Sequence, residues 1–154
     1  MNPSCKDLTS LAQPSHLLSI HPRHVANILA GTKTVECRKS AIGLSPGTRL
    51  YLYATAPTKA ILGEARVAEL LVGPPAALWA AHHGKTGVTE AEYFAYCQDA
   101  EQAVLLSLTE VARCSRPASL ALLRELQPGF SPPQTARRLG PAFSGISELL
   151  RDGS

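Results

Sequence analysis

The fold of this chain is decided around the stretch Gly31-Thr32-Lys33-Thr34-Val35-Glu36-Cys37-Arg38. A helical pattern precedes it, and Gly31 is well placed to end that helix because glycine tolerates the left-handed conformation. The residues after the lysine suit a strand, whose side chains alternate between two faces. Glu36 and Arg38 are therefore expected on one face, with Val35 and Cys37 on the other. Spacing alone leaves two interpretations open, a solvated edge strand with an ordinary charge pair or a functional cluster.

Three further regions accompany this stretch in order along the chain. They are Ser19-Ile20-His21-Pro22, then Tyr53-Ala54-Thr55-Ala56-Pro57 followed by Ala60-Ile61-Leu62-Gly63, and finally Ser131-Pro132-Pro133-Gln134-Thr135. Together with G-x-K-x-x-E-x-R, formed by Gly31, Lys33, Glu36 and Arg38, these regions resemble the ASCH domain family. The resemblance runs from about residue 15 to residue 139. It implies an α+β fold in which helices pack around a small PUA-like β-barrel.

Length and composition agree with one folded domain. The chain has 154 residues, of which 45% are hydrophobic and 18% charged, as is usual for a soluble globular protein. Residues 1–14 show no apolar periodicity and are predicted to form a disordered tail, while residues 15–154 form the ASCH/PUA-like domain. There is no continuous apolar run of the ~20 residues that a membrane span needs, and no signal peptide is recognised. A cytoplasmic protein without membrane contact is expected.

The cysteines and histidines indicate neither a metal nor a cofactor. The four cysteines lie far apart without a C-x-x-C pair, whereas a zinc site or a disulfide framework favours closer spacing. The histidine pairs, His21 with His24 and His82 with His83, lack a further set of ligands. Reduced thiols are expected, and the sequence sets no oligomeric state.

Charge is unevenly distributed along the chain. Residues 16–66 carry seven lysines and arginines against two glutamates, whereas residues 67–112 carry one lysine against six acidic residues. Residues 113–154 carry six arginines against three acidic residues. If these segments lie apart in space, the protein has a basic face that favours anionic ligands, and otherwise its surface is merely mixed.

Hydrophobic patterns place the remaining elements. Strands are predicted over residues 17–20, 49–53, 60–71 and 103–111, and helices over 24–30, 75–82 and 120–126 and near 144–151. Thr89 has the spacing of a capping box and begins another helix, with Tyr93, Phe94 and Cys97 facing inward. Arg116-Pro117 is expected to close the last strand. Ser131-Pro132-Pro133-Gln134 is interpreted as a further helix start.

The ASCH resemblance implies RNA or nucleoside binding in a cleft beside the signature strand. Some small members resemble amidohydrolases that deacylate a modified cytidine, and others have been described as ribonucleases. By this resemblance Lys33 is a candidate for base or nucleophile-activating duty. Glu36 would carry a proton or orient its neighbours, and Arg38 offers a planar fork for phosphate or carboxylate. The alternative is that these three residues form a salt-bridge network that fastens the strand to the barrel.

One position departs from the hydrolase pattern. In the amidohydrolase-like members the third residue after the lysine is a threonine proposed as nucleophile, and here it is Glu36. Their separate catalytic carboxylate has no clear match, although Glu90 and Glu92 lie in the comparable region. Their mechanism cannot be carried over unchanged, so nucleic-acid recognition is the safer inference.

Other residues are candidates for ligand contacts. Aromatic side chains that could stack on an unpaired base are Tyr51, Tyr53, Trp79 and Tyr93. A core position is the commoner role for each of these rings taken alone, and among them Tyr53 is preferred as a stacking ring because it lies beside Thr55 and the family-like turn at Pro57. His21 and Thr55 are further candidates for ligand binding. Arg23 and Lys59 are candidate phosphate contacts, although a solvated surface position is the commoner role for either residue alone.

Three hypotheses follow. The first is a domain that binds RNA or a modified nucleoside through the Lys33–Arg38 cleft. The second is a hydrolase, acting on an acylated nucleoside or an RNA phosphodiester, with Lys33 and Glu36 as catalytic residues. The third is a regulatory domain that senses a small anion or binds a protein partner.

Overall fold

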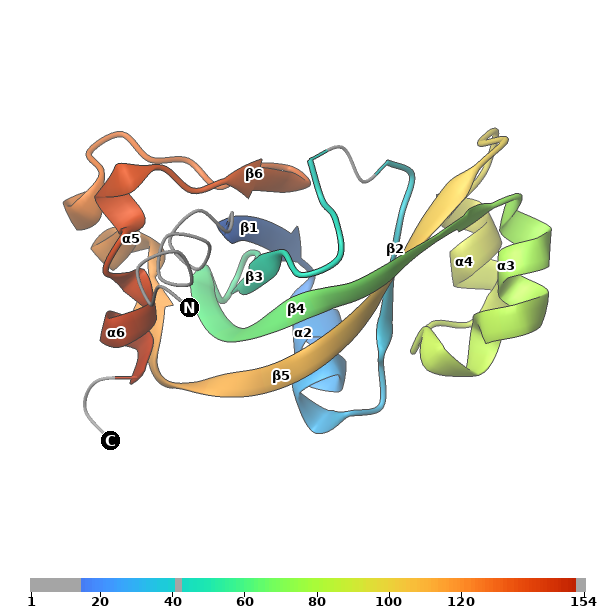
Figure 1. Cartoon of the computed structure of the whole chain (residues 1–154), viewed down its shortest axis with the longest axis horizontal. Helices are drawn as coiled ribbons and strands as arrows, with labels where there is room; N and C mark the ends of the chain where they lie inside the picture. The colour runs from blue at the N-terminus through green and yellow to red at the C-terminus, as the bar shows by residue number, and fades with distance from the viewer. Residues whose placement is uncertain (1–14, 41–42, 152–154) are drawn as a thin grey trace, which may run out of the picture.

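The computed structural model describes residues 15–40 and 43–151, so the predicted tail over residues 1–14 lies outside the described residues. A single sheet curls into a half-barrel, with strand order β2-β5-β4-β3-β1-β6 (Figure 1). The strands are β1 (Ser15–Ile20), β2 (Val35–Arg38), β3 (Arg49–Ala54), β4 (Ala60–Gly73), β5 (Ala103–Ser119) and β6 (Ala136–Arg138). β1 pairs with β3 in parallel, and the other neighbours are antiparallel.

Helices cover this sheet in separate groups. They are α2 (Pro22–Ala30), α3 (Pro75–His82), α4 (Glu90–Tyr96), α5 (Leu120–Leu126) and α6 (Ile146–Arg151), with short 3-10 helices at His83–Lys85 and Pro141–Phe143. In Figure 1, α3 and α4 lie at one end of the molecule and α5 and α6 at the other, while α2 packs near the middle. No helix in the described part of the chain is long and apolar enough to cross a membrane.

Alternating side chains divide the core into clusters on the two faces of the sheet. Leu50 and Leu52 of β3 join the cluster under α2, whereas Tyr51 and Tyr53 join the cluster that includes α5 and α6 residues. A third cluster packs β2 and the start of β5 against α3 and α4. The period of two in the sequence therefore decides which helices each strand face meets.

β4 and β5 run the length of the molecule as a ribbon, 14 and 17 residues long. The prediction that Arg116-Pro117 closes β5 is wrong, because the strand continues to Ser119. The register of the pair shifts between the Ile61 and Gly63 positions, and Pro117 lies within this irregularity. A proline is tolerated in a strand at such a bulge because no ladder hydrogen bond is required of it.

Two other local predictions are also corrected. Residues 131–135 do not begin a helix but run without helical structure into β6, and the Thr135 carbonyl accepts a hydrogen bond from the Ser19 amide at 2.9 Å. Successive prolines disfavour the helical region for the residues before them. In α4, Tyr93 and Cys97 face the core four residues apart, but Phe94 lies off that face and is 37% exposed.

Candidate functional site

Lys33 is positioned by the end of α2. Gly31 takes a φ of 86° and turns the chain out of the helix, a conformation that favours glycine. The Lys33 amide then donates to the Asn27 carbonyl at 3.1 Å, and the Thr34 amide donates to the Lys85 carbonyl at 2.9 Å. The lysine is therefore held between α2 and the connection that carries α3 and α4.

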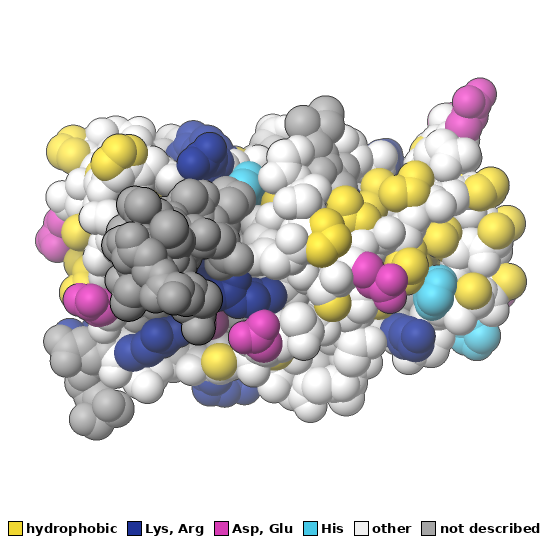
Figure 2. Space-filling view, viewed as in Figure 1, with side chains coloured by type: hydrophobic (Ala, Val, Ile, Leu, Met, Phe, Trp, Pro, Cys, Tyr) yellow, Lys and Arg dark blue, Asp and Glu magenta, His cyan; other side chains and the backbone are white. Residues whose placement is uncertain are grey.

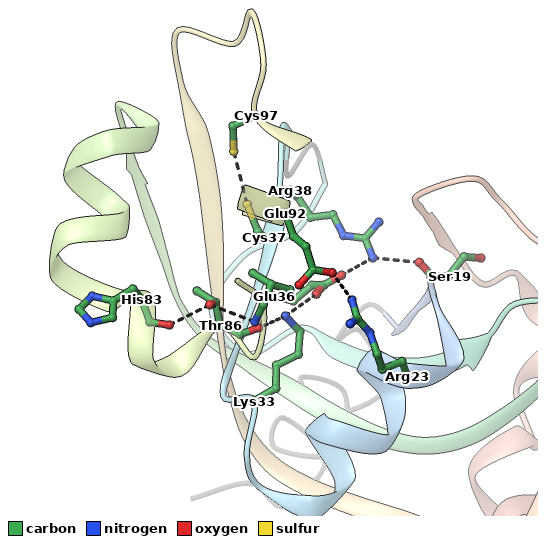
Figure 3. Close-up of polar contacts among 11 residues, drawn as sticks. Ser19, Arg23, Lys33, Glu36, Cys37, Arg38, His83, Thr86, Glu92 and Cys97 are labelled. Atoms are coloured by element: carbon green, nitrogen blue, oxygen red, sulfur yellow. Dashed lines mark hydrogen bonds and ion pairs between the residues drawn. The ribbon is translucent and has the colours of Figure 1, made fainter. Parts of the chain in front are cut away.

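The charged side chains of the signature stretch form one buried network (Figure 3). Glu36 lies between two cations, with Oε1 3.2 Å from Lys33 Nζ and Oε2 2.8 Å from Arg38 Nη2. Lys33 Nζ also donates to the Thr86 carbonyl, and Arg38 Nη2 donates to the Ser19 carbonyl at 2.9 Å. The exposed fractions of Lys33, Glu36 and Arg38 are 2%, 7% and 8%, so this is not a solvated charge pair.

Close packing fixes the lysine stem as well as its charge. A Cβ added to Gly87 would lie 3.1 Å from Lys33 Cβ, and Gly87 itself has a φ of 68°. Position 87 is therefore restricted to glycine by both space and backbone conformation. The network joins β1, β2 and the α3–α4 connection, as the fastening interpretation predicts.

The network also forms the floor of a cavity of about 330 Å³, which we call the lysine cavity. Its first wall comes from the end of β1 and the start of α2, with Ser19, His21 and His24. Its second wall comes from α4, with Glu92, Tyr93 and Tyr96. Fastening the strand and lining a cavity are thus properties of the same residues.

Glu92 holds the rim of the second wall in place. Its Oε1 accepts from the Thr89 amide at 2.9 Å, which completes the predicted capping box of α4, and its Oε2 pairs with Arg23 of α2. The bond from the Thr89 backbone, and then that from Arg23, lower the pKa of Glu92 to about 2. Arg23 is therefore engaged with a carboxylate across the cavity rim.

Two imidazoles stand beside the network. The His21 and His24 ring centroids are 6.0 Å apart, and His21 Nδ1 accepts from the Arg23 amide at 3.2 Å. Burial, followed by the positive charge of Lys33, lowers the pKa of His24 below its ordinary 6.5. His24 is neutral at pH 7 and can accept a proton or a hydrogen bond.

Not all of the predicted ligand contacts come together here. Tyr53 is 2% exposed and packs in the cluster under α5 and α6, and burial raises its pKa. Thr55 and Lys59 form the turn between β3 and β4, where the Thr55 carbonyl accepts from the Lys59 amide at 3.3 Å. None of these three residues lines the lysine cavity. The preferred stacking ring is thus a core residue that offers no open face.

The other aromatic candidates are divided between core and cavity. Tyr51 is buried in the same cluster as Tyr53, while Tyr93 lines the lysine cavity with its hydroxyl bonded to the Pro75 carbonyl at 2.8 Å. Trp79 packs against Tyr93 with ring centroids 4.8 Å apart. Tyr96, which sequence reasoning missed, lines the cavity and is 42% exposed, so it offers the more accessible ring.

Sequence reasoning also missed three polar contributors. The Ser19 and Thr86 carbonyls complete the network, and His24 joins His21 in the first wall. Carbonyl contacts leave no signal in side-chain identity, although Ser19 does belong to a family-like stretch. Within residues 15–40 and 43–151, no group of three or more His, Cys, Asp or Glu side chains is arranged to hold a metal ion.

Comparison with known proteins identifies the family that has this architecture. A family model described as the ASCH domain matches residues 18–120. The chain belongs to the ASCH family. A relative from Zymomonas mobilis, named an ASCH domain-containing ribonuclease, is 29% identical over 119 residues that make up 77% of this chain and 80% of the relative.

Solved structures agree with the family assignment. The crystal structure of ASCH from Zymomonas mobilis matches with a TM-score of 0.83 and 27% identity, over 88% of this chain and 94% of that one. The human THYN1 protein, solved in complex with DNA containing 5-methylcytosine, matches with a TM-score of 0.56 and 12% identity, over 92% of this chain and 100% of that one. The second likeness concerns the fold alone. The PUA-like architecture predicted from the sequence is confirmed.

Proposed function

We propose that this chain is a nucleic-acid-binding ASCH domain that takes an unpaired RNA base, or a modified nucleoside, into the lysine cavity. One observation carries the proposal. Three buried polar atoms of cavity-lining residues have no hydrogen-bond partner among the described residues, namely Ser19 Oγ, His24 Nδ1 and Arg38 Nε. Buried polar atoms are ordinarily paired, so their concentration here favours a ligand with both donors and acceptors. The edge of an unpaired base has both.

The size and charge of the lysine cavity support the same ligand. Its volume of about 330 Å³ lies at the small end of the ~300–1,000 Å³ usual for small-molecule sites, which suits one base or nucleoside rather than a helix. Glu36 offsets one of the two charges of Lys33 and Arg38, and Glu92 adds a second carboxylate to the lining, so a neutral base fits better than a bare phosphate. The half-exposed ring of Tyr96 offers a stacking surface.

The relatives support nucleic acid as the ligand class. The Zymomonas mobilis relative is named a ribonuclease, and THYN1 was solved with DNA bound. The free thiols of Cys37, Cys97 and Cys114 fit a reducing compartment such as the cytoplasm.

A second candidate function is RNA hydrolysis, which the name of that relative favours. In this proposal Lys33 Nζ and Arg38 stabilise negative charge as hydrogen-bond donors, because their contacts with Glu36 hold both in place. Glu36 has both oxygens engaged and orients the cations rather than attacking the substrate. His21 and His24 are the proton carriers nearest to them in the lysine cavity.

Ser19→Ala tests the binding proposal most directly. It removes a buried hydroxyl that has no partner, so the free energy of unfolding should stay the same or rise. Fluorescence anisotropy with a short single-stranded RNA, and calorimetry with nucleosides, should nevertheless show weaker binding. Full affinity in Ser19→Ala would remove the observation on which the proposal rests.

Lys33→Met tests both candidates in the same samples. It keeps the apolar stem but removes the charge, and affinity per folded molecule should fall at least tenfold, or about 1.4 kcal/mol. Lys85→Met is the matched control, since Lys85 is exposed and its side chain has no partner among the described residues. RNA cleavage that disappears only in Lys33→Met would establish hydrolysis. Unchanged binding and cleavage would overturn both candidates.

A further inference from the structure

A second and larger hollow, of about 900 Å³, lies beyond the lysine cavity. It is bounded by the start of β1 and β3, by β4, and by the segment from β6 to α6. Four arginines line it, and we call it the basic groove: Arg49, Arg66, Arg138 and Arg151. In Figure 2, dark-blue side chains gather on the half of the molecule that holds β1, β6 and α6, whereas yellow ones dominate the half with α3 and α4.

Two of these arginines are anchored to carboxylates. Arg151 Nη2 lies 2.8 Å from Glu64 Oε1, and Arg66 Nε lies 3.6 Å from Glu110 Oε2. Arg66 also donates to the Gly47 carbonyl at 2.9 Å. These contacts hold the far side of the basic groove in shape.

The other two arginines meet no carboxylate in the described part of the chain. Arg49 is half-buried, and its recorded side-chain contact is a hydrogen bond to the neutral Ser147 hydroxyl at 3.1 Å. Arg138 is exposed, and its side chain makes no hydrogen bond or ion pair with the described residues. Glu148 also lines the groove but pairs with neither of them. Two of the four guanidinium groups in this concave surface, those of Arg49 and Arg138, thus have no carboxylate partner among the described residues.

We infer that the basic groove is a binding site for phosphate groups. A guanidinium offers several donors in a plane and binds phosphate through paired hydrogen bonds, which suits Arg49 and Arg138. The Ser147 hydroxyl that orients Arg49 lies in the same wall. The groove's volume of about 900 Å³ leaves room for more than one phosphate, either of a free polyphosphate or of an RNA backbone, and both share this chemistry.

This site is separate from the lysine cavity and does not depend on the function proposed for it. Ser15 lines the basic groove and Ser19 lines the cavity, at opposite ends of β1. Four residues of strand span about 13 Å. The two hollows share no lining residue.

The pKa of the neighbouring His16 imidazole is sensitive to the positive charge at the edge of the groove. His16 pairs with Arg138 in the register of β1 and β6, and it is only 6% exposed. Burial, followed by the charge of Arg138, lowers the pKa of His16 below 6.5. A bound anion at Arg138 would oppose the second of these effects.

The test compares wild type with the double variant Arg49→Met/Arg138→Met. Calorimetry with tripolyphosphate and anisotropy with a short uridine oligonucleotide measure the two phosphate sources separately. The double variant should lose at least tenfold in affinity for one or both ligands. Loss for tripolyphosphate alone identifies free phosphates as the ligand, and loss for the oligonucleotide alone identifies the RNA backbone.

Three controls separate a binding site from general effects. Ser147→Ala removes the hydrogen bond of Arg49 but keeps its charge, so it should lose less than the double variant. Arg113→Met removes an exposed arginine that does not line the groove, and Lys33→Met alters the other hollow. Both should retain tripolyphosphate binding. If neither ligand binds wild type, or if Arg113→Met weakens binding as much as the double variant, the inference is overturned.

Discussion

The lysine cavity and the basic groove use the same kinds of side chain in opposite ways. In the cavity, Lys33 and Arg38 share the carboxylate of Glu36, and all three are at least nine-tenths buried. In the groove, Arg49 and Arg138 meet no carboxylate among the described residues, and the space beside them is nearly three times larger.

This difference assigns different roles to paired and unpaired cations: stabilising the fold and contacting a ligand, respectively. A buried cation with its counterion contributes to the fold, and removing one partner is costly because the other stays behind in a medium of low polarity. A cation at a concave surface without a counterion contributes little to stability and is available to a ligand. The following predictions test that division, beginning with the largest expected effect.

Glu36→Gln should destabilise the protein strongly. The change leaves Lys33 and Arg38 buried without their shared carboxylate, a situation that costs about 3–5 kcal/mol. Urea unfolding measures the loss. Glu148→Gln, which alters an exposed carboxylate of the groove, is the matched control and should change stability by less than about 0.5 kcal/mol. Equal effects of the two substitutions would contradict the division.

Salt should separate the two proposed ligand sites. Between about 50 and about 500 mM KCl, tripolyphosphate affinity should fall at least tenfold because ions screen exposed charges. Nucleoside binding in the charge-balanced lysine cavity should change by less than about twofold over the same range. Calorimetry at each salt concentration provides both values. If the nucleoside affinity depended on salt as strongly as the tripolyphosphate affinity, the positive and negative charges of the lysine cavity would not be balanced.

Acid should destabilise the first wall of the lysine cavity. The pKa of His24 is lowered in the folded state, so the unfolded chain binds the extra proton first as pH falls below 6.5. The free energy of unfolding should therefore decrease on acidification through this range, by less than the loss in Glu36→Gln. His24→Gln should make the curve shallower. A variant that follows the wild-type pH dependence would exclude His24 as its source.

The smallest expected effect is at the edge of the groove. Arg138→Met removes a positive charge near His16, so the pKa of that imidazole should rise, although burial will keep it below 6.5. Nuclear magnetic resonance titration of the ring protons measures the change. Arg113→Met serves as control. An unchanged His16 pKa in Arg138→Met would show that this arginine does not set the field there.

Local patterns predicted much of the lysine cavity. The alternation of a strand placed Glu36 beside Arg38, and the spacing of the signature placed Lys33 within reach of Glu36. The capping box at Thr89 was likewise readable, because it depends on residues three apart. These are interactions between near neighbours in sequence.

The remainder depends on contacts between distant segments. Thr86 reaches Lys33, and Tyr96 reaches the cavity, only because the segment that holds α3 and α4 folds back toward β2, which no local period encodes. Tyr53 alternates like a surface residue, yet α5 and α6 cover its face of the sheet. Pro117 is expected to end β5, but it lies in a β-bulge where the strand continues past it. In each case tertiary packing overrode a correct local rule.

The long β4–β5 ribbon has a consequence for how such a protein can diversify. Residues 74–102 connect β4 to β5 at one end of this ribbon, and this segment supplies one wall of the lysine cavity. Lys33 meets it mainly through a backbone carbonyl, that of Thr86, which any residue type provides. Apart from Gly87, which the close approach of Lys33 restricts to glycine, the residues of this segment that face the cavity can therefore change while the buried charges stay in place. The wall of the cavity is thus freer to vary in sequence than the sheet that carries it.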